Sequence, residues 1–147
     1  MLTGSSSADV PFAIEHCWTL VADIERAPQW QRTLLVVEVV ERDDQGRALV
    51  CDTVSDAKLT KITCRVRMSY DELHTVRWTQ VQSDDLVAMD GSWTLESLGS
   101  ELTRATYRLA VDPGPIGFMA RPLERMIRPA VIGHQAEELL LALESGF

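Results

Sequence analysis

The sequence predicts one α+β domain in which a curved antiparallel sheet wraps around a long helix. Three observations support this: an amphipathic helix near the start, about six strands with alternating apolar residues between 34 and 111, and a long apolar helix at the end. The strand region holds no helical stretch long enough for a crossover, so consecutive strands are expected to pair as a meander. One helix cannot fill the concave side of such a sheet, which predicts an internal apolar cavity.

Composition favours an ordinary soluble domain. The chain has 147 residues, and residues 1–147 are assigned to a single domain. Its net charge of −8 repels nucleic acid and anionic membrane surfaces. No apolar run approaches the roughly 20 residues of a membrane span, and no signal-peptide pattern opens the chain. We therefore expect a cytoplasmic monomer or weak homodimer, with no nucleic-acid partner and no membrane insertion.

The first helix is expected from about Pro11 to Arg26. Proline is favourable at the first helical position, and Asp9 is a plausible N-cap. Apolar residues at spacings of three and four give the helix one apolar face. Pro28 ends the helical region. Trp30 follows on the connection, where it either plugs the core beneath the loop or faces a ligand.

The next strand spans about Thr33 to Arg42 and carries an almost continuous apolar run. Such a run is typical of a strand that is covered on both faces. The segment 43–46 is acidic and ends in glycine, which predicts a hairpin turn. Its paired carboxylates also allow a calcium interpretation, but the glutamate that closes an EF-hand loop is missing, so a solvated turn is favoured.

Strands are then expected at 48–55 and 61–70. The second alternates almost perfectly between apolar and polar residues, so one of its faces is dry. Val66, Met68 and Tyr70 lie on that face and are candidates to line the cavity. A phenol can orient a ligand, and a thioether adapts to a ligand's shape.

Three further strands are expected at 75–81, 87–97 and 102–111. Gln80 would be a buried amide, either a satisfied structural group or a handle for a ligand. Gly91 in mid-strand predicts a bulge or a close backbone approach. The cavity candidates from these strands are Trp78, Gln80, Met89, Trp93 and Tyr107.

The segment 113–117 is rich in proline and glycine and is expected to form a lid, with Phe118 and Met119 as further cavity candidates. A helix is expected over 122–144, with a kink near Pro129. His134 falls near its apolar stripe. This histidine is either a satisfied core or surface residue or a catalytic base.

Motifs for catalysis are missing from the sequence. It contains no nucleophile elbow, no phosphate-binding loop, no dinucleotide fingerprint and no zinc-protease motif. Three scattered cysteines predict buried structural thiols, and the scattered histidines predict no metal site. No cofactor is expected, and the catalytic residues, if any, are unknown. Any catalysis would rest on polar groups in the cavity, with Tyr70, Tyr107, Gln80 and His134 the best available.

Six short segments together form a recognisable series: Val10-Pro11, 17–23, 28–30, 43–46, 91–95 and 113–118. Their order and spacing resemble the START/Bet v1-like superfamily, in particular its bacterial polyketide cyclase/dehydrase and coenzyme Q-binding branch. The resemblance implies a helix-grip fold with seven strands, the first over about 3–8. Pro129 and Gly133 depart from the unbroken final helix of that pattern.

The same resemblance implies a hydrophobic small-molecule ligand, since members bind lipids, polyketides, quinones or hormones. Some members catalyse cyclisation or aromatisation without a cofactor. We rank binding or transport of such a ligand first, because containment explains more of the sequence than chemistry does. The alternative is a cofactor-independent polyketide cyclase or dehydratase. A third hypothesis is a partner-binding module that uses the apolar lid around Phe118.

Overall fold

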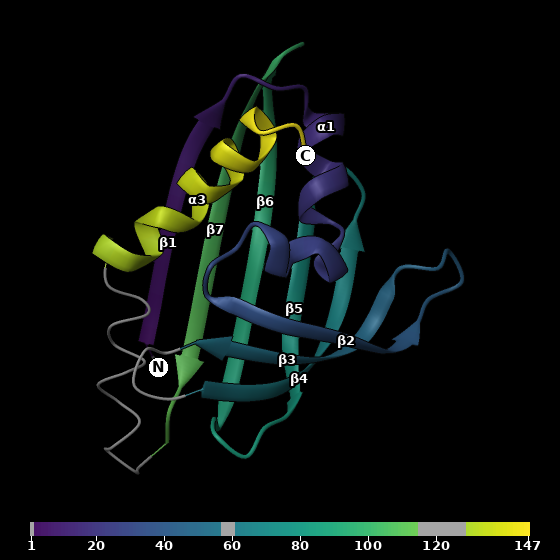
Figure 1. Ribbon diagram of the computed structural model, residues 1–147, viewed down its shortest axis with the longest axis vertical. Helices are drawn as coiled ribbons and strands as arrows, with labels where there is room; N and C mark the ends of the chain where they lie inside the picture. Colours follow the sequence, from purple (N-terminus) through teal and green to yellow (C-terminus); the bar gives the residue numbers. More distant parts are fainter. Residues whose placement is uncertain (1, 57–60, 115–128) are drawn as a thin grey trace.

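The computed structural model describes residues 2–56, 61–114 and 129–147. Seven strands in this part of the chain form one antiparallel sheet in the order β1-β7-β6-β5-β4-β3-β2, which confirms the predicted fold class. Figure 1 shows the sheet curving around the helices. The elements are β1 (Leu2–Val10), α1 (Ile14–Val21), η1 (Ile24–Gln29), β2 (Leu34–Arg42), β3 (Ala48–Asp56), β4 (Lys61–Asp71), β5 (Thr75–Gln82), β6 (Ala88–Gly99), β7 (Leu102–Asp112) and α3 (Pro129–Glu144).

Strand β1 forms although seven of its nine residues are small or polar. It pairs with β7 along its whole length, from Leu2 opposite Val111 to Val10 opposite Thr103. Its outward side chains also contact β7. The carboxylate of Asp9, for example, accepts a hydrogen bond from Arg104 at 2.8 Å. Pairing with a neighbouring strand, rather than apolar content, therefore determines this strand.

The first helix is shorter than predicted, and its expected cap is wrong. Asp9 still belongs to β1, and the N-cap of α1 is Ala13, which makes no side-chain cap. The α-helix ends at Val21 instead of Arg26, and η1 follows as a 3-10 helix. A 3-10 helix has three residues per turn, so it places every third side chain on one face. One row of η1 side chains therefore faces the sheet.

The prediction that β2 is covered on both faces is wrong. Because β2 is the last strand of the sheet, one of its edges is unpaired, and Val36 and Val40 are each 50% exposed. The hairpin that follows is confirmed. Asp43 accepts hydrogen bonds from the backbone N–H groups of Gln45 and Arg47, both at 2.9 Å, and Gly46 adopts a φ of 80°. The Asp43 carboxylate is thus used within the turn.

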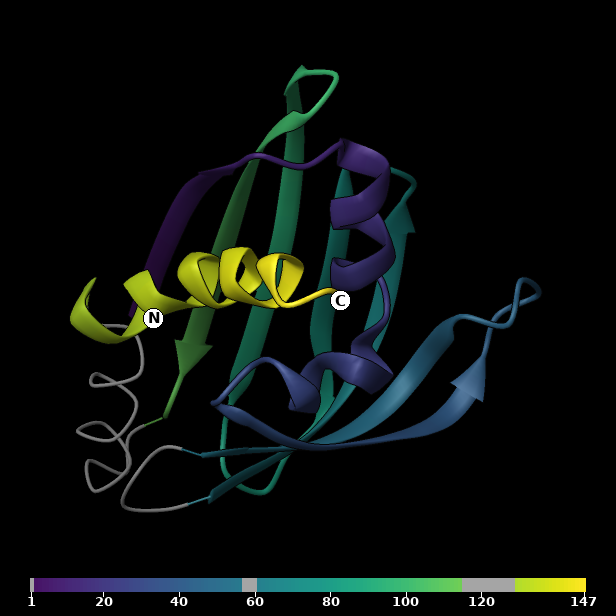
Figure 2. The ribbon, with the colours of Figure 1, turned by 45° about the horizontal axis from the view of Figure 1, so that its top comes forward.

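Strands β4 and β7 show the predicted alternation most clearly. Their inward side chains are buried and most of their outward ones are exposed. Figure 2 shows α3 crossing the concave face of the sheet, with α1 and η1 beside it. From His134 onward, the buried side chains of α3 include Ala136, Leu139 and Leu143. The start of the predicted helix at 122 and the residues before its predicted kink lie outside the described residues, and α3 begins at Pro129.

Candidate functional site

A cavity lies between the concave face of the sheet and the segment that joins η1 to β2. The space open to the centre of a water-sized molecule is about 90 Å³, several times the roughly 10–15 Å³ that one water molecule requires. Most of the lining is apolar, and none of the lining residues in the described ranges carries a formal charge. A small, mainly apolar molecule suits such a space.

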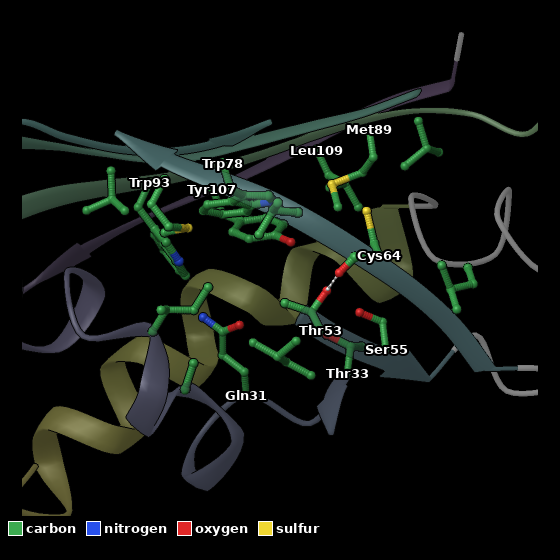
Figure 3. A pocket seen from close by; sticks show the side chains of 18 of the residues that line it. Gln31, Thr33, Thr53, Ser55, Cys64, Trp78, Met89, Trp93, Tyr107 and Leu109 are labelled. Carbon is green, nitrogen blue, oxygen red and sulfur yellow. Dashed lines mark hydrogen bonds between the residues drawn. The ribbon is translucent and has the colours of Figure 1, made fainter. Parts of the chain in front are cut away.

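Four aromatic rings form one end of the cavity wall. The Trp93 ring lies edge-on to Tyr107, with 5.1 Å between ring centroids. Trp78 lies 5.8 Å from Tyr107, and Trp30 lies 6.0 Å from Trp93. These are ordinary packing distances for aromatic pairs. The chain of contacts fixes each ring through its neighbours and gives the cavity a rigid aromatic end (Figure 3).

Gly91 makes the contact between Trp78 and Tyr107 possible. It pairs with Trp78 across β5 and β6, and the Trp78 indole occupies the space where a side chain at position 91 would start. The indole thereby passes over β6 and reaches Tyr107 on β7. The predicted close backbone approach at Gly91 is confirmed, while the register of β6 with both neighbours is regular at this point. A bulge at Gly91 is therefore wrong.

The 3-10 helix η1 and its C-cap residue supply the part of the wall that faces the sheet. Ile24, Ala27 and Trp30 are spaced by three, and all three line the cavity. Such spacing is the period of a 3-10 helix, whose side chains at i and i+3 are eclipsed. Trp30 is 8% exposed, so it is part of the core and also of the cavity wall. Its Nε1–H is buried and has no hydrogen-bond acceptor in the described part of the chain.

Two polar side chains enter this apolar space without a partner. Tyr107 is 8% exposed and Gln31 is 9% exposed. Among the described residues neither the Tyr107 hydroxyl nor the Gln31 amide makes a side-chain hydrogen bond. Figure 3 shows both directed into the cavity, Tyr107 from the sheet and Gln31 from the connection beneath it. Burial raises the pKa of Tyr107, so its hydroxyl stays protonated at neutral pH.

Helix α3 holds the connection that carries Gln31. The carboxylate of Glu138 accepts a hydrogen bond from the Arg32 backbone N–H at 2.7 Å. The Gln135 side-chain amide donates to the Thr33 hydroxyl at 3.2 Å. Burial raises the pKa of Glu138, and the Glu138 charge further raises the pKa of Tyr107. The acidic side chain of Glu138 thus lies near Tyr107 and near the connection that carries Gln31.

A family model described as polyketide cyclase/dehydrase and lipid transport matches residues 10–134. The chain belongs to this family. No curated protein shows significant sequence similarity to it. The coenzyme Q-binding branch, which the sequence also resembles, is not the one matched. The cavity is therefore that of a member of this family, whose description names both a cyclase/dehydrase activity and lipid transport.

Solved structures show the same fold. A START superfamily protein from Mycobacterium smegmatis superimposes with a TM-score of 0.80 at 18% identity, over 97% of each chain. A Thermus thermophilus protein gives 0.80 at 20% identity, over 99% of this chain and 100% of the other. An aromatase/cyclase from Streptomyces sp. R1128 gives 0.77 at 16% identity, over 97% and 93%. The family member described here therefore has the helix-grip fold that its sequence predicted.

Seven of the twelve predicted cavity residues lie on the cavity wall of this family member. Trp30 and the inward residues of β4 to β7 supply them, and the β-strand period of two explains why sequence alone could place the strand residues. Phe118 and Met119, and with them the predicted lid, lie outside the described residues. The seven are Trp30, Val66, Met68, Trp78, Met89, Trp93 and Tyr107.

The other three predicted residues do not line the cavity. The Tyr70 hydroxyl donates to the Ala48 carbonyl at 2.6 Å, at the turn end of the sheet and away from the cavity lining. Gln80 is a satisfied structural amide, because its Nε2 donates to the Leu86 carbonyl at 3.0 Å. The His134 side chain is 65% exposed and contacts Glu137 at 3.1 Å on the surface of α3. Each of these three polar side chains contacts a partner within the protein.

Four polar lining residues were missed by sequence reasoning. Gln31 and Thr33 lie on a connection, and Thr53 and Ser55 lie on β3, whose sequence shows no clean alternation. The Thr53 hydroxyl is satisfied, since it donates to the Cys64 carbonyl at 3.1 Å. For Gln31, the one available signal was its position directly after a core tryptophan.

Metal and membrane features are not found among the described residues. They contain no group of three or more His, Cys, Asp or Glu side chains placed to hold a metal ion. No helix in the same ranges has both the length and the apolar content for a membrane span. The three cysteines are free and buried, as predicted.

Proposed function

We propose that this protein binds and carries a small hydrophobic molecule in its internal cavity. The observation that supports this best is the aromatic end of the cavity, where Trp78, Trp93 and Tyr107 are held by mutual ring contacts. A rigid aromatic wall binds flat apolar molecules without first having to be ordered, and preorganisation of this kind favours binding. Quinones, aromatic polyketides and lipids with a flat ring are the candidate classes.

The test uses a neutral dye, N-phenyl-1-naphthylamine, whose fluorescence rises in apolar surroundings. Wild-type protein is expected to bind it saturably with one site per chain. Ser55→Phe places a large ring in the cavity wall and is expected to abolish this binding. Ser92→Phe is the matched control, because Ser92 lies between the inward residues 91 and 93 and so points to the convex face.

Loss of binding in Ser55→Phe alone supports the proposal, provided both variants keep the wild-type circular dichroism spectrum. Binding that does not saturate, or that survives in Ser55→Phe, would contradict it. Native mass spectrometry of protein purified gently from its host then identifies the natural ligand. A stoichiometric quinone, lipid or aromatic polyketide in the extract fixes the chemical class.

A second candidate function is polyketide cyclisation or dehydration, favoured by the state of Tyr107. Its hydroxyl is buried, protonated and without a partner in the described ranges, so it is available to donate to a substrate carbonyl. Such a donor stabilises the negative charge that develops on that oxygen during an aldol-type ring closure. The test is the product profile on a poly-β-ketone substrate. Tyr107→Phe is expected to change it and Tyr70→Phe, outside the cavity, to leave it unchanged.

A further inference from the structure

We infer that the cavity is specific for a flat aromatic molecule that carries an uncharged oxygen group, a hydroxyl or a carbonyl, and that Tyr107 and Gln31 determine this specificity. The inference rests on the proposed binding function and extends it to the ligand's chemistry. The inference starts from two polar side chains in a mainly apolar wall. Tyr107 and Gln31 are each more than nine-tenths buried, and both point polar groups into the cavity without hydrogen-bond partners among the described residues.

Buried polar groups in proteins are nearly always hydrogen-bonded, so unpaired ones require a physical reason. Here both groups face the same cavity, Tyr107 from the sheet and Gln31 from the connection beneath it. Two buried side chains without partners in the described ranges that face one cavity are the expected state of a binding site that its ligand completes.

The chemistry of the two cavity groups selects the ligand. The Tyr107 hydroxyl stays protonated and donates a hydrogen bond, which suits a carbonyl or hydroxyl oxygen. The Gln31 amide offers both a donor and an acceptor, which suits a hydroxyl on the ligand. The two groups come from opposite walls, Tyr107 from β7 and Gln31 from the connection before β2 (Figure 3). A ligand held by both therefore lies across the cavity.

Charge further restricts the choice. Glu138 is buried beside this connection through its bond to the Arg32 N–H, and its charge acts on Tyr107. A carboxylate bound by Tyr107 would meet that negative charge in surroundings that screen it poorly. An uncharged oxygen group meets no such repulsion. The cavity should therefore prefer a phenol to the corresponding aromatic acid.

The experiment uses three probes of one ring size: naphthalene, 2-naphthol and 2-naphthoate. Isothermal titration calorimetry at pH 7 is expected to show 2-naphthol as the tightest binder. Tyr107→Phe and Gln31→Met are each expected to weaken 2-naphthol binding about three- to ten-fold, the effect of one neutral hydrogen bond. Naphthalene binding is expected to stay unchanged in both variants. Tyr70→Phe, the same substitution outside the cavity, should alter neither.

The outcomes distinguish the two proposals. If no probe binds, the proposed function fails and the inference fails with it. If naphthalene binds as tightly as 2-naphthol, or if the variants weaken both probes equally, the binding function stands and the specificity inference is overturned. Tight binding of 2-naphthoate would overturn the argument from Glu138.

Discussion

Replacing Gly91 by alanine tests how the aromatic end of the cavity is built. The added Cβ would overlap three ring atoms of the Trp78 indole, Cε2, Nε1 and Cζ2. The indole is also in contact with Tyr107, with 5.8 Å between ring centroids, and a shift of the indole would disturb this contact. The substitution therefore forces either the ring or the β6 backbone to move.

The cost follows from two opposing effects. Overpacking a buried site costs about 1–3 kcal/mol. Removing a glycine lowers the entropy of the unfolded chain, which returns about 0.4–1 kcal/mol. The free energy of unfolding should therefore fall by about 1.5 kcal/mol. For a domain of this size that lowers Tm by about 5 °C.

Urea denaturation followed by tryptophan fluorescence measures the change. Gly99→Ala is the matched control, because a Cβ there meets only the Leu102 Cβ, at an ordinary 3.9 Å. In a Trp78→Leu background the cost of Gly91→Ala should largely disappear, which gives a double-mutant coupling energy of about 1–2 kcal/mol. An equal cost in both backgrounds, or equal effects at positions 91 and 99, would refute the reasoning.

Three further predictions concern single groups. Burial raises the pKa of Glu138 above its unfolded value, so the protonated Glu138 carboxyl stabilises the native state below about pH 4.5, and this contribution is lost as pH rises through the folded pKa. The urea midpoint of Glu138→Gln should therefore exceed that of wild type at pH 7, and the difference should close on acidification. A difference that stays constant with pH would contradict the raised pKa of Glu138. Burial raises the pKa of Cys51 to about 11 and that of Cys64 to about 12. We expect a thiol reagent at pH 8 to label these two cysteines only when urea unfolds the protein. Labelling of the native protein within minutes would disprove this prediction. Tyr70→Phe removes a 2.6 Å hydrogen bond to the Ala48 carbonyl. In the same urea assay it should lower the free energy of unfolding by about 1 kcal/mol, and it should leave the Kd for a cavity ligand unchanged. A changed Kd would show that Tyr70 takes part in ligand binding.

The fold could be predicted where the chain repeats a simple period. Alternation of apolar and polar residues identified the inner faces of β4 and β7, because a strand exposes its two faces to different surroundings. Strand β1 shows the limit of this approach. Its residues Leu2–Val10 carry little apolar signal, and only the family resemblance placed a strand there. Its structure depends on β7, which no local pattern reports.

The candidate site was predictable on the sheet and not on the connection. Inward strand positions gave Met68, Trp93 and Tyr107. The sequence placed Ile24 in an α-helix that ends near Arg26 and Ala27 in the break after it, so the period of three in η1 was missed. Polar side chains were the least predictable group. The sequence does not show whether Gln80 or Gln31 finds a partner, because this depends on how the backbone around each side chain folds. The Gln80 amide meets the Leu86 carbonyl in the turn that follows, whereas the Gln31 amide makes no side-chain hydrogen bond among the described residues.

The pairing of β1 with β7 has a kinetic consequence. It joins residues far apart in sequence, such as Ser7 and Thr106 with a separation of 99, and α3 packs on the same strand. Closing so long a loop is slow, whereas the hairpins from β2 to β7 pair with near neighbours. During synthesis on the ribosome, the N-terminal strand must therefore wait for nearly the whole chain to emerge. We expect the cavity to close late, and a ligand present in the cell to meet its inner wall while the protein is still folding.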